Sequence, residues 1–107
     1  MQFIDNNPIY KIIRTTGPYH NFLVVKLSEK ELENPTIIED LASHQVEAVI
    51  AKEDVLNQVV SGIEQASLEL NHHYFVEKIQ FLSTDTQSVS VYKYLAGEII
   101  NRIIKQR

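Results

Sequence analysis

The sequence predicts an α+β fold: a two-layer sandwich in which a four-stranded sheet carries two helices on one face, in the order β-β-β-α-β-α. Three observations predict it. Apolar residues recur at helical spacing over 55–70 and again over 92–104, with one stripe in each segment. Four other segments are rich in β-branched and aromatic residues. With 107 residues, 44% of them hydrophobic, the chain has the size of a single domain, 1–107, with one core.

The first two strands are expected to form a hairpin over 9–29. The stretches PIYKIIRTT and NFLVVKLSE flank TGPYH, which carries a Gly-Pro turn signal. Apolar residues occupy both faces of the second strand: Phe22 and Val24 on one, and Leu23, Val25 and Leu27 on the other. We therefore expect this strand to be central in the sheet or covered on both sides.

The segment that follows is acidic from 28 to 43 and contains the turn pair Asn34 and Pro35. A short helical turn is expected around TIIEDLA, over 36–42. The next stretch, HQVEAVIA over 44–51, places its apolar side chains on one face and predicts the third strand.

The first helix is predicted to follow this strand with almost no spacer. Glu53 and Asp54 lie in its first turn, where the positive end of the helix dipole favours acids. Its apolar face comprises Val55, Leu56, Val59, Val60, Ile63, Ala66 and Leu70.

The fourth strand and the last helix complete the fold. Phe75, Ile79 and Phe81 alternate with Val76, Lys78 and Gln80, which is typical of a half-buried strand. Ser88 is the expected cap of the last helix. The apolar stripe of that helix comprises Tyr92, Leu95, Ala96, Ile99, Ile100, Ile103 and Ile104. One stripe on each helix and one apolar face on the strand place both helices on the same side of the sheet.

Gly62 and Gly97 each lie in a predicted helix near its apolar stripe. A helical glycine costs about 1 kcal/mol relative to alanine, so a packing benefit is expected. We predict that both glycines let backbone approach backbone closely.

Composition narrows the class of protein. There is no cysteine, signal-peptide pattern or apolar stretch that approaches the length of a membrane span, which predicts a cytoplasmic protein without membrane contact. The net charge of −4 disfavours nucleic acid as a partner. Two charge clusters are interpreted as a solvated connector and a helix end, namely Glu29, Glu31, Glu33, Glu39 and Asp40, and Arg102, Lys105 and Arg107.

One segment resembles a known family. VIAKEDVLNQVVSGIEQA, over 49–66, resembles the part of domain IV of translation elongation factor G where a strand ending in Val-Ile-Pro-Lys enters a helix reading Val-x-x-Gly-Ile-x-x-Ala. The counterparts here are Val49, Ile50, Lys52, Val59, Gly62, Ile63 and Ala66, with Ala51 in place of the proline. TTGPYHNFLVVKLSE resembles the glycine-rich hairpin of the family, and 74–100 resembles its Tyr-Pro-Val strand, tip loop and closing helix, with Ala96 and Gly97 as the Ala-Gly pair. The resemblance covers nearly the whole chain from about Lys11.

The resemblance implies a left-handed β-α-β crossover, shared with several ribosomal proteins, and no catalysis, since GTP hydrolysis belongs to a separate domain of the factor. It implies a small accessory protein that contacts ribosomal or other structured RNA through two tip loops. The corresponding candidates here are Arg14, Gly17, Tyr19, His20, Thr84, Asp85 and Gln87. The hairpin turn keeps only one glycine, and the second tip loop lacks the Asp-Gly turn and the His-Asp pair of the family. The resemblance therefore implies a shared fold more than a shared activity.

The alternative is a protein-interaction or homodimerisation module that has lost RNA binding. The two apolar faces of the second strand imply an exposed apolar surface opposite the helices. Depending on register, its contributors are Leu23, Val25, Leu27, Ile12 and Tyr10. The charge around Gly17 and Asp85 discriminates between the two functions, because a basic tip favours RNA and an acidic or neutral one argues against it.

An enzyme is not predicted, and neither is a metal or other cofactor. Adjacent His72 and His73 should point to opposite faces rather than converge on a metal. A nucleophilic set of Asp85, a histidine and a serine (Ser83, Ser88 or Ser90) is not supported by any nucleophile-elbow motif.

Overall fold

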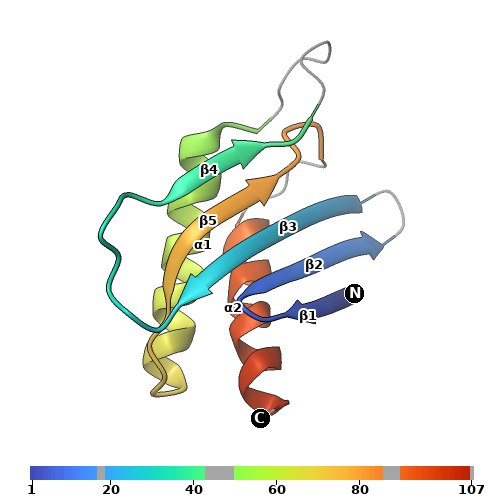
Figure 1. Cartoon of the computed structure of the whole chain (residues 1–107). Helices are drawn as coiled ribbons and strands as arrows, with labels where there is room; N and C mark the ends of the chain where they lie inside the picture. Colours follow the sequence, from blue (N-terminus) through green and yellow to red (C-terminus); the bar gives the residue numbers. More distant parts are fainter. Residues whose placement is uncertain (17–18, 43–49, 86–89, 107) are drawn as a thin grey trace.

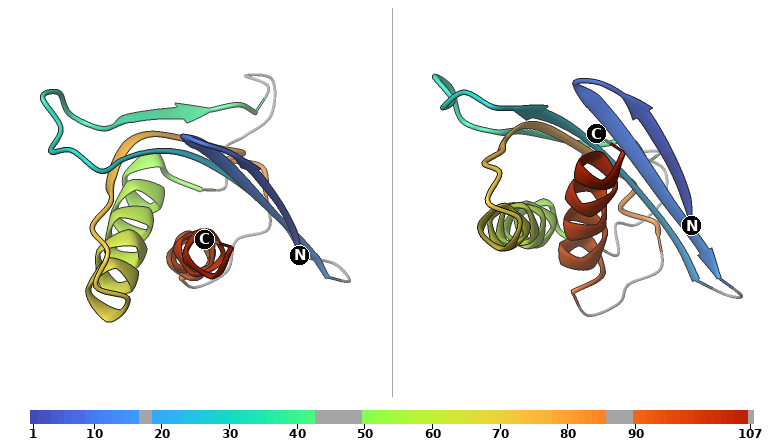
Figure 2. Two further views of the ribbon diagram at one scale, coloured as in Figure 1. Left: turned by 60° about the horizontal axis from the view of Figure 1, so that its bottom comes forward. Right: turned by 90° about the horizontal axis from the view of Figure 1, so that it is seen from below.

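The computed structural model describes residues 1–16, 19–42, 50–85 and 90–106. Five strands form one mixed sheet in the order β1-β2-β3-β5-β4, and two helices pack against each other on one face of it (Figures 1 and 2). The elements are β1 (Gln2–Asn6), β2 (Ile9–Thr16), β3 (Tyr19–Ser28), β4 (Ile37–Asp40), α1 (Lys52–Glu69), β5 (Phe75–Phe81) and α2 (Val91–Lys105). The α+β class, the hairpin, the fourth predicted strand and both helices are confirmed. The sheet has five strands instead of four, and the order is β-β-β-β-α-β-α.

The first strand, β1, was not predicted. It pairs antiparallel with β2, from Gln2 opposite Ile13 to Asn6 opposite Ile9. The Phe3 ring stacks on Tyr10 with 6.4 Å between ring centroids, and the Arg102 guanidinium lies 5.8 Å from the centroid of the same ring. Tertiary contacts of Phe3 with β2 and α2 therefore support a strand that its short, Asn-rich sequence does not indicate.

The expected helical turn over 36–42 is wrong, because Ile37–Asp40 form β4, which pairs in parallel with β5. The Thr36 hydroxyl donates to the Val76 carbonyl at 2.8 Å, and the Leu41 N–H donates to the Phe81 carbonyl at 2.8 Å. Pairing with β5 thus decides the conformation of a segment too short to decide it locally.

Most of the predicted third strand, 44–51, lies outside the described residues. Of the two residues that are described, Ile50 is buried and donates its N–H to the Ser83 carbonyl at 3.2 Å, and Ala51 immediately precedes α1. Ile50 therefore ties the entry of α1 to the loop that leaves β5.

The connection from β4 through α1 to β5 is left-handed (Figure 1). In that view α1 lies behind the sheet, and when the two parallel strands are turned to point upward, β5 lies to the right of β4. Parallel crossovers are right-handed in about 98% of cases, so this one is an exception.

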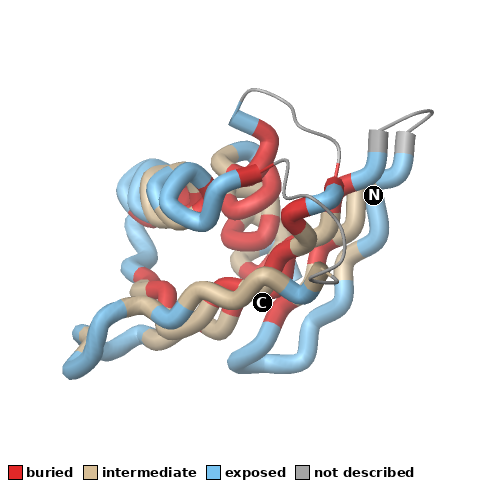
Figure 3. The backbone as a smooth tube through the Cα atoms, turned by 90° about the horizontal axis from the view of Figure 1, so that it is seen from above, coloured by how far each residue is buried: buried red, intermediate tan, exposed pale blue. Residues whose placement is uncertain are grey.

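The core fills the space between the sheet and the helices, where the buried backbone segments gather in Figure 3. The sheet contributes Tyr10, Ile12, Leu23, Val25, Leu27, Val76, Ile79 and Phe81. The helices contribute their two predicted stripes except for Val60, which faces a groove beside α1 instead. These sheet side chains are at most 5% exposed. The core thus fixes which face of the sheet is covered.

The two helices meet at Gly62. A Cβ placed there would lie 2.3 Å from the Lys93 carbonyl oxygen, whereas a Cβ at Gly97 would meet only the Gly62 carbonyl oxygen at 3.9 Å. The predicted close approach therefore requires glycine at Gly62, while at Gly97 there is room for a methyl group. The expected cap Ser88 lies outside the described residues; Ser90 precedes α2, and the Tyr92 N–H donates to the Gln58 side chain of α1 at 3.1 Å.

Candidate functional site

The described residues that flank the two predicted tip loops lie at one end of the sheet. Leu23 in the middle of β3 pairs with Phe81 at the end of β5, so the chain that leaves β5 runs beside the first half of β3. There the Asp85 carboxylate accepts the N–H of Phe22 at 2.7 Å. A residue of the predicted loop after β5 thus holds the backbone of β3, close to the start of that strand.

The candidate residues differ in how they are presented. His20 and Thr84 are exposed, Arg14 is partly buried in β2 opposite Asn21, and Asp85 is 6% exposed. The backbone of Tyr19 begins β3, but its side chain lies outside the described part, as do Gly17 and Gln87. Among the described candidates, His20 and Thr84 are therefore the two with exposed side chains.

Asp85 serves the structure of the tip. Burial raises the pKa of its carboxyl, although the hydrogen bond from Phe22 and the nearby charge of His20 partly offset this. Its own N–H donates to the Leu82 carbonyl at 3.0 Å and closes a turn. A buried carboxylate bound to backbone positions the loop and repels phosphate.

A second polar group, Asn21, is buried beneath the tip. It is 0% exposed and lies close to the Tyr92 hydroxyl at the start of α2. Burial and the charge of Asp85 raise the pKa of Tyr92 to about 12, and the Asn21 side chain partly offsets the rise. Tyr92 therefore stays neutral and protonated at physiological pH, and this polar cluster joins the hairpin to α2.

Asp40 ties β4 to the same end of the sheet. Its Oδ1 accepts the N–H of Ser83 at 3.0 Å and the N–H of Ala42 at 2.9 Å. Burial alone would raise the pKa of Asp40, but these bonds, the Ser83 side chain and the charge of Lys52 hold it below its ordinary value. Asp40 is thus ionised near neutral pH and holds the segments that follow β4 and β5.

The tip is not basic over the described residues. Its described charged residues include the cations Arg14 and Lys52 and the carboxylates of Asp40 and Asp85, so neither sign is in excess. An anionic ligand gains little from such a surface. The charge of the tip therefore argues against RNA.

The histidines and serines do not converge on a catalytic or metal site in the described ranges. His72 pairs with Glu29 at 3.1 Å and stacks on Tyr74, whereas His73 packs edge-on against Phe75, so the two rings diverge as predicted. No group of three metal-ligating side chains occurs among the residues placed by the structure. In the same described ranges, no helix is long and apolar enough to cross a bilayer. His44 and Ser88 lie outside them.

The open face of the sheet, opposite the helices, is a second candidate surface. The register corrects the residues expected there: Leu23, Val25, Leu27, Ile12 and Tyr10 lie beneath the helices. The strands instead present Ile4, Ile9, Lys11, Ile13, Phe22, Val24, Lys26, Ile37, Glu39, Lys78 and Gln80. Ile4 and Ile9 are 41% and 42% exposed. A shallow hollow of about 260 Å³ lies over this face, lined by Ile9, Val24, Lys26, Lys78 and Gln80.

The lysines of the open face have partners. Lys26 pairs with Glu77 at 3.1 Å and Lys78 with Glu39 at 2.6 Å, while the Lys11 ammonium lies 5.5 Å from the centroid of the Phe22 ring. This face therefore combines exposed aliphatic side chains with balanced charges.

No protein-family model, curated protein or solved structure matches the chain. The function is therefore argued from the geometry of the two surfaces.

Sequence reasoning missed Asn21, Asp40 and the aliphatic residues of the open face. The two polar residues belong to types that are mostly exposed, so nothing in the sequence marks them as buried anchors. The alternation of Ile9, Lys11 and Ile13 was a usable signal, because residues two apart along a strand share one face.

Proposed function

We propose that this chain is a non-catalytic protein-interaction module that associates with a second copy of itself through the open face of the sheet. The observation that carries the proposal is the exposure of Ile4 and Ile9, beside Ile13 and Phe22, on the layer that no helix covers. Contiguous exposed aliphatic side chains rimmed by polar ones are typical of protein-binding surfaces.

The charges of the open face favour a second copy as the partner. In a two-fold dimer the same patch meets itself, so a patch must be complementary to its own charges. The pairs Lys26–Glu77 and Lys78–Glu39 supply both signs, and a rotated copy can exchange partners between the pairs. The lysine stems add apolar contact while their ammonium groups reach the rim.

The oligomeric state tests this proposal. We expect the wild type to be a dimer in sedimentation equilibrium, and the double variant Ile4→Lys, Ile9→Lys to dissociate at least about tenfold more readily, because two cations per copy would be brought together. The matched control is Leu68→Lys on α1, where the side chain is 77% exposed in the other layer. A monomeric wild type, or equal weakening by the control, would reject the proposal.

A second candidate function is contact with ribosomal or other structured RNA through the tip. Two observations support it. The left-handed crossover and the order of elements from β2 to α2 agree with the resemblance to domain IV of elongation factor G, and Asp85 after β5 contacts Phe22 of β3. The charge of the tip weighs against it, so self-association is the better supported function.

Co-sedimentation with ribosomes and their subunits at low and moderate salt tests the RNA contact. If the tip binds RNA, association should weaken as salt rises and should be lost in the Tyr19→Ala, His20→Ala variant. The matched control is His73→Ala, an exposed histidine before β5. A wild-type protein that stays at the top of the gradient at both salt concentrations would rule out this function there.

A further inference from the structure

The edge of the sheet at β4 offers backbone hydrogen-bonding groups. β4 is the last strand of the described sheet, next to β5 alone. Because Leu41 donates its N–H to Phe81, and alternate residues of a parallel strand bond the same neighbour, Ile37 and Glu39 also face β5. The N–H and C=O groups of Ile38 and Asp40 therefore point outward, where another strand can pair with them.

A groove runs beside this edge on the helix side of the sheet. It has a volume of about 430 Å³ and lies between Pro35 and Thr36, which lead into β4, and one side of α1. From α1 it is lined by Leu56, Asn57, Val60, Ser61 and Glu64. Leu56 and Val60 are only partly buried, so they offer apolar contact to side chains that enter the groove.

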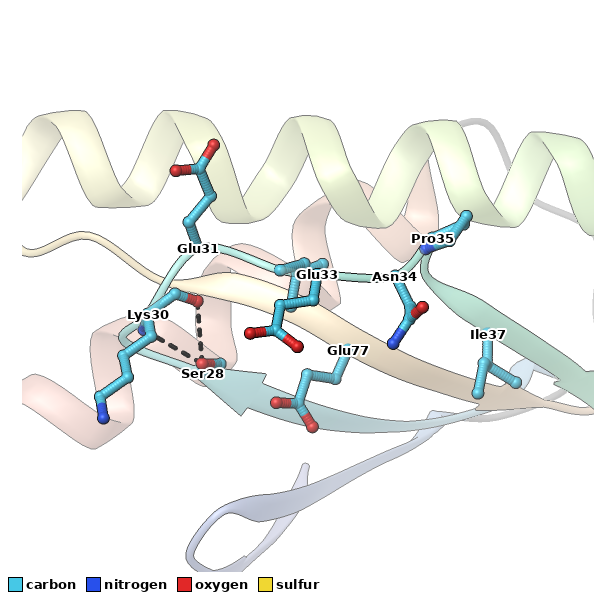
Figure 4. Close-up of a pocket in the computed structure, with 9 residues that line it drawn as sticks. Ser28, Lys30, Glu31, Glu33, Asn34, Pro35, Ile37 and Glu77 are labelled. Carbon is cyan, nitrogen blue, oxygen red and sulfur yellow. Dashed lines mark hydrogen bonds between the residues drawn. The ribbon is translucent and has the colours of Figure 1, made fainter.

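The other side of the β4 entry holds an acidic hollow of about 380 Å³ (Figure 4). Glu33, Asn34 and Glu77 point into it, whereas Glu31 points away. Pro35 lines both this hollow and the groove beside α1, so the two meet at the start of the edge strand. Ile37, on the same side as the hollow, is 57% exposed.

From this arrangement we propose that β4 binds an extended peptide segment of a partner protein as an additional strand, and that the segment alternates aliphatic and basic residues. Side chains of an added strand alternate between the two faces of the sheet. One set would contact Leu56 and Val60 in the groove. The other set would lie beside Ile37, toward the acidic hollow. Main-chain hydrogen bonds to Ile38 and Asp40 provide affinity, and the side chains provide selectivity.

Charge complementarity identifies the basic character of the segment. Glu33 and Glu77 line the hollow, where Glu77 is paired with Lys26, and Glu64 lines the groove. Lys30 also lines the hollow, but its side chain points out of it in Figure 4. Anionic surroundings on both sides of one edge favour a cationic partner and repel an acidic one.

A titration of the 15N-labelled full chain with an acetylated, amidated Lys-Val-Lys-Val-Lys-Val peptide tests the proposal. Amide signals of Ile38 and Asp40, and of Leu56 and Val60 across the groove, should shift with saturation. A peptide with glutamate in place of lysine should not bind. A Lys-Val peptide N-methylated at alternate residues keeps its charge and apolar surface but lacks the N–H groups, and should bind at least about tenfold more weakly.

Two variants with the same change in net charge separate the groove from general electrostatics. Glu64→Lys reverses a charge that lines the groove and should weaken peptide binding at least about fivefold. Glu69→Lys changes an exposed residue of the same helix outside the groove and should leave binding nearly unchanged. Both positions are exposed, so the fold should tolerate both changes.

Three results would overturn the proposal: shifts that spare Ile38 and Asp40, equal binding of the N-methylated peptide, or equal weakening by the two variants. Shifts at β4 that depend on protein concentration without peptide would assign the edge to a second copy instead. Because Leu56 and Val60 of the groove belong to α1, in the other layer from Ile4 and Ile9, shifts at these two residues report peptide binding separately from self-association through the open face.

Discussion

Gly62→Ala is expected to destabilise the domain by at least about 2 kcal/mol, since overpacking a close contact costs about 1–3 kcal/mol and the obstacle here is backbone. The new methyl carbon would lie 2.3 Å from the Lys93 carbonyl oxygen and 3.1 Å from the Ala96 Cβ. The carbonyl oxygen can retreat only if α2 moves away from α1. Separation of the helices would loosen the core contacts of Ile63 and Leu95.

Gly97→Ala provides the matched control. Its methyl group would meet only the Gly62 carbonyl oxygen, at an ordinary contact distance of 3.9 Å. Removal of a helical glycine then stabilises by about 0.5–1 kcal/mol. Urea denaturation of both variants measures the difference. If both substitutions were destabilising to a similar extent, the helices would not meet at Gly62 as the structure describes.

The elements that the sequence predicts are those with sustained periodicity. The stripe that includes Val55, Val59 and Ile63 runs over several turns and specifies α1 without outside help. By contrast, β4 has four residues, and Ile37 and Ile38 suit either a helical turn or a strand. Its conformation depends on β5, which follows about 35 residues later.

The face of the sheet that the helices cover was not predictable for a similar reason. Tyr10 and Ile12 are apolar, but so are Ile9 and Ile13 on the other side of β2. Periodicity separates the two faces and does not say which one the helices cover. The volume and shape of the core decide this, and they place the Tyr10 ring against Phe3 beneath α2.

The candidate tip was predictable as a pair of neighbouring loops but not in its chemistry. The pairing of Leu23 with Phe81 brings the flanks of the two loops to one end of the sheet, as the resemblance to a domain with two tip loops implied. Burial of Asn21 and Asp85 follows from contacts with Phe22 and Tyr92, which only the folded arrangement defines. Asp85, which was expected at a binding surface, therefore holds the fold together instead.

Asp40→Ala is expected to destabilise the domain by about 1–3 kcal/mol at neutral pH, because the N–H of buried Ser83 would be left without its acceptor, which costs about 1–3 kcal/mol. Both the Ser83 and the Ala42 N–H groups bond to the same carboxylate oxygen, and Ser83 is 2% exposed. Asp40→Asn keeps a carbonyl acceptor at this position and should cost less. Glu39→Ala is the matched control: Glu39 belongs to the same strand, but its ion pair with Lys78 is on the surface, so stability should hardly change.

The pH dependence of the unfolding free energy distinguishes the ionic contribution of Asp40 from side-chain packing. Since the folded pKa of Asp40 lies below its ordinary value of about 3.9, its ionic stabilisation is complete above that value and is lost as the pH falls through the folded pKa. Asp85 has the opposite sign, because its raised pKa makes its contribution fall as the pH rises. Both the wild type and Asp40→Ala contain Asp85, so the pH-dependent contribution of Asp85 cancels in the difference between their free energies of unfolding. This difference should stay constant above about pH 5 and shrink below about pH 4. A difference independent of pH down to about pH 3 would show that the charge of Asp40 does not contribute to stability.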